Sequence, residues 1–231
     1  MTDENKQEAK DVLDISALLR KELEEMSKTV APPSGFVIGT KGKRFTLPDG
    51  SASDGPLTCV IVDWISFNKY YSGAYNANAL TAPDCWALNK NVQELGPSKS
   101  SPKPQNETCE GCPRNEWGSA IGGGKGKACK NTRRLLVISV AELAANGPDA
   151  QAYTIDVSPT GLKHFDKYIT SLNNRDAHPA SMITDITFEP NESFPSLRFK
   201  AVEASTYIEA AWHCKTANQS LLTIEPTPSE K

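Results

Sequence analysis

The sequence predicts a mainly β fold of the α+β class. Two observations support it: several short segments are rich in β-branched and aromatic residues, and a helical segment lies between two of them. A third is a long loop that holds three of the six cysteines. Together they predict a small closed barrel of the oligonucleotide-binding (OB) type with a four-cysteine insertion, an inserted helix and terminal helices. A two-sheet sandwich explains the same order of segments.

Three parts are expected along the 231 residues. Residues 1–34 form an N-terminal amphipathic helix and linker, and residues 35–220 form the OB-like β domain. The metal-binding insertion occupies about residues 89–132 of that domain. Residues 221–231 are expected to be a flexible C-terminal tail.

The N-terminal helix is predicted from apolar residues at helical spacing. They are Val12, Ile15, Leu18, Leu19, Leu23 and Met26. Such a helix either caps its own domain or serves as an arm that is disordered or binds a partner.

The strands are predicted from alternating or continuous apolar runs between turns rich in Gly, Pro, Asn and Asp. Their ranges are 36–39, 43–47, 57–71, 85–88, 133–140, 152–157, 181–189 and 194–202. A helix begins at Pro159 with Ser158 as its N-cap, because one apolar face follows them. A second helix covers about residues 204–217.

Composition excludes several classes of protein. A formal net charge of −3 is too negative for a protein that coats duplex DNA by bulk positive charge. No apolar run approaches the roughly 20 residues that cross a bilayer, and the polar N-terminus does not resemble a secretory signal. We therefore expect a cytoplasmic protein without membrane contact, whose cysteines bind metal rather than form disulfides.

The cysteine spacing predicts a metal site. The pattern C-x23-C-x2-C-x16-C comprises Cys85, Cys109, Cys112 and Cys129. The C-x2-C pair lets two thiolates converge on one ion, and zinc is the expected metal. Cys85 is the ligand furthest along the chain from the C-x2-C pair, and it would close the insertion at its base.

Two other interpretations of these cysteines stay open. Four thiolates also hold iron–sulfur clusters, and spacing alone does not separate the two. A redox-active pair at Cys109 and Cys112 is less favoured, because no βαβ pattern surrounds it. Cys59 and Cys214 are expected to be small core residues.

A basic, glycine-rich stretch follows the C-x2-C pair. Its cations are Arg114, Lys125, Lys127, Lys130, Arg133 and Arg134. Glycine interleaved with lysine brings the backbone close to phosphates and suits a flexible single strand. The stretch has no G-x4-G-K-[ST] register, so nucleotide hydrolysis is not expected.

Several aromatic residues are candidates for stacking on bases. They are Trp64, Tyr70, Tyr71, Trp86 and Trp117. The alternative is that the rings fill the core and cover the metal loop. Trp64 and Phe67 differ by an odd number of positions, so they point to opposite faces of a strand and at most one is expected in the core.

Enzymatic activity is not expected. Asp63, Asp84 and Asp156 are scattered among the predicted strands without a motif, and no histidine lies near a candidate nucleophile.

Five segments resemble a family of phage and prophage single-stranded DNA-binding proteins, over about residues 36–200. They are LPDG, VIVDWISFNKYYSGAY, PDCWAL, CEGCPRNEWGSAIGGGKGKACKNTRRL and VSPTGLKHFDKYI. The resemblance implies a virus-encoded accessory factor for DNA replication or recombination in a bacterial host, with an OB barrel and a zinc insertion. The chain's last residues, IEPTPSEK, depart from the long acidic tail through which many such binders recruit partners.

The function expected from the sequence is binding of single-stranded DNA by the basic loop and the stacking aromatics. Replication or recombination proteins of the phage or host are expected partners. The alternative is a zinc-containing interaction module that binds a host replication or transcription protein. Salt dependence separates the two, because binding to phosphates weakens steeply with added salt.

Overall fold

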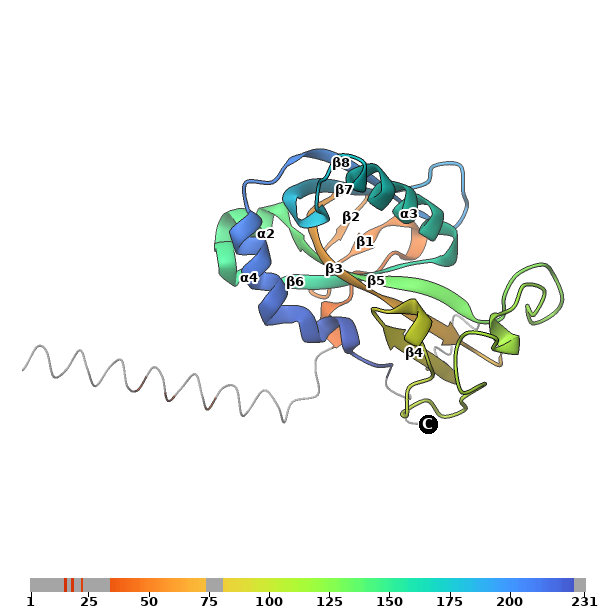
Figure 1. Cartoon of the computed structure of the whole chain (residues 1–231). Helices are drawn as coiled ribbons and strands as arrows, with labels where there is room; N and C mark the ends of the chain where they lie inside the picture. The colour runs from red at the N-terminus through yellow and green to blue at the C-terminus, as the bar shows by residue number, and fades with distance from the viewer. Residues whose placement is uncertain (1–14, 16–17, 19–21, 23–33, 74–80, 227–231) are drawn as a thin grey trace, which may run out of the picture. The chain divides into compact units, whose positions relative to one another are not determined.

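The computed structural model describes most of the chain from Ser34 onward (Figure 1). The described residues are 15, 18, 22, 34–73 and 81–226. The chain divides into two units, Met1–Gly35 and Phe36–Lys231, and the fold below is that of the second. The amphipathic helix expected near the N-terminus lies almost wholly outside the described residues.

A six-stranded antiparallel sheet forms the centre of the second unit. Its long central strand is β3 (Leu57–Tyr70). Along one edge β3 pairs with β5 (Lys130–Ser139), and β5 pairs in turn with β6 (Ala152–Val157). A bulge at Val62 interrupts the register between β3 and β5.

The other edge of β3 is shared by two strands. β7 (Met182–Phe188) pairs with its first three residues, and β4 (Cys85–Asn89) pairs with its last five. β8 (Leu197–Ala204) then pairs with β7 in the hairpin that the sequence predicts. The path through the sheet is β6-β5-β3-β7-β8, with β4 attached to β3.

One face of the sheet is covered by α3 (Pro159–Asn173). Phe165 and Leu172 of this helix are buried against alternate residues of β3, β5 and β6. A small hairpin of β1 (Phe45–Thr46) and β2 (Ala52–Ser53) contributes Phe45 to the same core.

The opposite face is covered by α2 (Val140–Asn146) and α4 (Ile208–Asn218), seen at the left of Figure 1. Leu143 and Cys214 of these helices pack on Val60 and other residues of the sheet. The sequence analysis did not predict α2. Both faces are therefore buried, which explains why nearly every residue of β3 from Cys59 onward is buried or half-buried.

Short 3-10 turns complete the described part of the chain. They are η1 (Ser34–Phe36), η2 (Lys41–Lys43), η3 (Val92–Glu94), η4 (Pro113–Asn115), η5 (Gly147–Asp149), η6 (Pro179–Ser181) and η7 (Gln219–Thr223).

The fold is thus mixed α+β, with mostly sheet and few helices, as the sequence predicts. The closed OB-like barrel is not confirmed. In the described ranges the sheet ends at β6 on one side and β8 on the other, and these two strands do not pair. α3 contacts both of them, so a helix rather than a ladder of backbone hydrogen bonds connects the two edges.

The C-terminal boundary also differs from the expected one at residue 220. Leu221 and Leu222 are buried in the second core, and the guanidinium of Arg134 donates hydrogen bonds to the carbonyls of Leu222 and Ile224. Residues 221–224 are therefore part of the folded domain, in keeping with their apolar sequence LLTI.

Replacement of Arg134 by alanine is expected to lower the free energy of unfolding by about 3 kcal/mol, because a buried charge pair is broken. Its guanidinium lies 3.2 Å from Asp156 and 4.2 Å from the ring centre of Phe67. Arg133→Ala is the matched control. Arg133 pairs with the half-exposed Asp166, and such a surface pair contributes about 0–1 kcal/mol. Urea unfolding measures both, and equal losses would contradict the buried role of Arg134.

Candidate metal centre and nucleic-acid interface

The end of β3 brings two of the predicted ligands together. Cys85 is the first residue of β4 and pairs with Tyr70, the last residue of β3. Cys129 comes directly before β5, whose first residue, Lys130, pairs with Lys69. Because β4 and β5 lie on opposite edges of β3, Cys85 and Cys129 flank the end of this strand.

The other two cysteines lie on a tight turn, Cys109–Cys112. Gly111 has a φ of 69°, a left-handed conformation that favours glycine. The amide of Cys109 donates to the carbonyl of Leu95 at 2.8 Å, and the side chain of Asn115 donates to the carbonyl of Cys109 at 2.9 Å. These bonds fix the turn, called the knuckle below, over the sheet.

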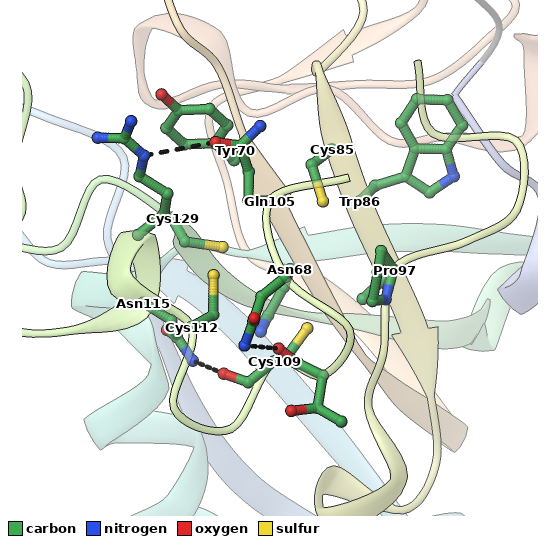
Figure 2. Close-up of a pocket in the computed structure, with 14 residues that line it drawn as sticks. Asn68, Tyr70, Cys85, Trp86, Pro97, Gln105, Cys109, Cys112, Asn115 and Cys129 are labelled. Carbon is green, nitrogen blue, oxygen red and sulfur yellow. Dashed lines mark hydrogen bonds between the residues drawn. The ribbon is translucent and has the colours of Figure 1, made fainter. Parts of the chain in front are cut away.

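All four cysteines line one cavity (Figure 2). The amide of Cys129 donates to the carbonyl of Arg114 at 2.7 Å, which ties the knuckle to the start of β5. The cavity has a volume of about 20 Å³. That is room for about one water-sized sphere. The four predicted ligands, Cys85 included, are thus gathered from three separate segments of the chain.

Burial favours the neutral form of two of the thiols, those of Cys109 and Cys129. Burial raises the pKa of Cys109 to about 11, with Cys85 and Cys112 adding to the shift while a hydrogen bond with Asn68 opposes it. Burial and the neighbouring cysteines raise the pKa of Cys129 to about 12. Across the described part of the chain, no three Cys, His, Asp or Glu side chains are arranged to hold a metal ion as they stand. Binding of a metal would therefore require deprotonation and closure of the thiols.

The two remaining cysteines are core residues, as predicted. Cys59 lies in the core under α3, and Cys214 lies in the core under α4. Neither lines the cavity.

The basic loop of residues 116–128 is fastened at its base. The amides of Gly118 and Ala120 donate to the carbonyl of Gly126 at 3.0 and 3.1 Å. The loop extends beyond the start of β5 (Figure 1). Its tip contains Gly122 and Gly123, with φ of 86° and 87°, so non-glycine residues would be strained there.

The predicted cations fall into two groups. Arg114, Lys125 and Lys130 are exposed, and the half-buried Lys127 lies 5.5 Å from the ring centre of Trp117. The others belong to the sheet. Arg133 is half-buried beside Asp166, and Arg134 is buried beneath the C-terminal segment, so Arg134 is removed from the candidate interface.

Most of the aromatic residues predicted to stack on bases are buried or half-buried, so that prediction is wrong for them. Trp117 is 79% exposed, whereas Trp86 and Tyr70 are 0% and 5% exposed. Trp64 is half-buried and packs edge-to-face on α3, and Tyr71 is half-buried. Both faces of the sheet are covered, so rings on either side of β3 are used in packing. Only Trp117 among these five residues presents an open ring.

The sequence analysis missed Asn68. This residue is 6% exposed on β3 and lines the four-cysteine cavity beside Cys109. A buried asparagine within a strand of apolar residues was the available signal, because buried amides need partners and asparagine is rare in strands.

Comparison with known proteins gives no identity: no protein-family model, curated protein or solved structure matches this chain. The class that the fold and the site define is an α+β protein with a four-cysteine cavity and a basic loop. No helix within the described ranges has both the length and the apolar character to cross a membrane.

Cys85→Ser tests the fourth ligand. The variant is expected to weaken zinc binding by at least the roughly 10–100-fold that loss of an outer-shell partner costs. Cys214→Ser is the control, because Cys214 is buried outside the cavity. Competition with a chromophoric chelator measures the affinity, and unchanged zinc binding in Cys85→Ser would leave three cysteines in the site.

Zinc affinity is expected to rise by about a hundredfold per pH unit between pH 6 and 8. The raised pKa values of Cys109 and Cys129 mean that at least these two thiols each release a proton when metal binds. Proton release makes binding stronger as pH increases. The same chelator competition at several pH values checks the slope, and a flat profile would show that the thiols are not the ligands.

Proposed function

We propose that this protein is a non-enzymatic, zinc-containing protein that binds single-stranded DNA. The observation that supports this most is the presence of an exposed ring and two lysines on one loop. Trp117, Lys125 and Lys127 lie on a glycine-rich loop whose base is joined to the four-cysteine cavity. A stacking ring beside cations is what sequence-independent binders of single strands use.

Zinc fits the donor set. Four thiols from two strand ends and one knuckle match the all-cysteine structural sites in which zinc is tetrahedral. The small volume of the cavity supports one ion over an iron–sulfur cluster, since a cluster also has to accommodate its bridging sulfides. In this role the metal would fix the knuckle and the basic loop against the sheet and would take no part in chemistry.

The positive charge is concentrated although the chain is acidic overall. Arg114, Lys125, Lys127 and Lys130 all lie within 17 residues of one another in the sequence, and Glu116 is the one acid between Arg114 and Lys130. Such a local patch attracts a phosphate backbone without the high net charge of a duplex-coating protein.

The carboxylates considered as catalytic candidates are paired with lysines. Asp63 lies 2.5 Å from Lys90, and Asp84 lies 3.1 Å from Lys103. Burial raises the pKa of Asp156, but the charges of Lys69 and Arg134 outweigh it and hold that pKa below its usual range. The three carboxylates are separated and individually neutralised, which favours structural roles.

The proposal includes a role in phage DNA replication or recombination, in the cytoplasm of a bacterial host, and this part depends on the sequence resemblance alone. A closed OB barrel is not needed for it. The open sheet carries the knuckle and the basic loop at one end of β3, and these elements supply the binding surface.

The double variant Lys125→Ala, Lys127→Ala is expected to weaken binding to labelled oligo-dT. It should also reduce the slope of log affinity against log salt by about 1.4, at roughly 0.7 for each phosphate that a lysine no longer neutralises. Lys167→Ala, Lys200→Ala is the control, because these lysines are exposed but lie on α3 and β8. Fluorescence anisotropy at several salt concentrations, with a matched duplex and metal content measured in parallel, gives both quantities. Equal slopes in both variants would contradict the assignment.

A protein-interaction module is the second candidate, and one observation favours it. Ile208 and Trp212 on α4 are 48% and 55% exposed, on a helix whose other side packs on the sheet. If the zinc-loaded protein binds no oligonucleotide, protein interaction becomes better supported than single-strand binding. Its interface would then be dominated by apolar contacts and insensitive to salt.

A further inference from the structure

A second cavity lies beside the four-cysteine cavity. This groove has a volume of about 420 Å³ and is formed by β3, η3, the knuckle and the start of β5. Asn68, Cys109 and Asn115 line both cavities. The volume falls in the range of about 300–1,000 Å³ that is typical of sites for small ligands.

Carboxamides dominate the polar lining of this groove. They are the side chains of Asn68, Gln93, Asn115 and Asn131. A carboxamide has both donor and acceptor atoms, so it recognises planar groups with alternating donors and acceptors. The edges of nucleobases are such groups, and Asn and Gln pair with adenine through two hydrogen bonds.

Internal hydrogen bonds position two of these amides. Asn115 donates to the carbonyl of Cys109, and its oxygen accepts from the side chain of Asn131 at 2.9 Å. Lys127 approaches the same oxygen at 3.4 Å. Asn115 is thus occupied by the protein itself, whereas Asn131 donates through its nitrogen and, among the described residues, its side-chain oxygen accepts no hydrogen bond.

The charges around the groove suit a nucleotide. Lys127 and Arg133 line it, and Glu110 is the one acid among its lining residues. Lys127 also lies beneath Trp117, which connects the groove to the exposed end of the basic loop. Two cations and four neutral amides around one groove suit a ligand that carries both a phosphate and a base.

We propose that this groove takes one unstacked nucleobase of a bound single strand and gives the protein a base preference. The proposal rests on the single-strand binding proposed above and names the part of the ligand that this site recognises. Asn131 and Gln93 read the base edge, Asn68 closes the floor beside the knuckle, and Lys127 and Arg133 hold the flanking phosphates. Adenine is the preferred base.

The test compares oligo-dA, oligo-dC and oligo-dT of equal length at one salt concentration. The wild-type protein is expected to bind oligo-dA at least about fivefold more tightly than the others, the lower end of what one well-formed base contact contributes. In Gln93→Ala, Asn131→Ala the three affinities are expected to converge, with zinc content and salt slope unchanged. Lys125→Ala is the matched control. Lys125 does not line the groove, so all three affinities should fall by a similar factor.

Three outcomes overturn the proposal, and they are distinguishable. Equal affinities of the wild type for all three oligonucleotides, or a preference that survives in Gln93→Ala, Asn131→Ala, would show that the groove does not read a base while single-strand binding stands. Failure to bind any of the three would overturn single-strand binding itself, and the groove proposal with it.

Discussion

Hydrogen bonding along both edges of β3 is the constraint on which the rest of the structure depends. The strand is 14 residues long, and a buried backbone group without a partner is costly. β5 follows one edge almost throughout, while β7 and β4 pair with the two ends of the other. Between these ends lies the bulge, where the carboxylate of Asp63 accepts from the amide of Trp64 and the amine of Lys90. The strands are arranged outward from β3 to the two edge strands, β6 and β8, and the sheet is open because these two do not pair with each other.

The candidate site is a consequence of that pairing. β4 and β5 lie on either side of β3, so the residues at their starts, Cys85 and Cys129, reach the same end of the sheet. The 23 residues between Cys85 and Cys109 then fold back, so that the two cysteines of the knuckle line the same cavity as Cys85 and Cys129. A metal ion there would join the insertion to the sheet, and Asn68 would link the metal cavity to the groove beside it. Loop order and ligand binding would thus depend on the same contacts.

Alternation along β5 separates two neighbouring arginines that look equivalent in the sequence. Arg133 faces α3 and the groove, and Arg134 faces the opposite core, where Asp156 neutralises it and the carbonyl of Ile224 accepts a hydrogen bond from it. The same alternation on β3 puts Trp64 and Phe67 on opposite faces, as expected. Phe67 is fully buried, whereas Trp64 is half-buried at the margin of the other core, so only one of the two rings is a core residue, as expected.

The sequence by itself determined the features that depend on local chemistry. Turn residues and apolar runs predicted β3, β4, β6, α3 and the hairpin of β7 and β8, and the cysteine spacing predicted that Cys85, Cys109, Cys112 and Cys129 come together. Tertiary structure alone decided which residues are exposed, because burial depends on what packs against a strand and not on its own pattern. It therefore buried Trp86, brought Leu221 and Leu222 into the core, left Trp117 open and set amides from four elements around one groove.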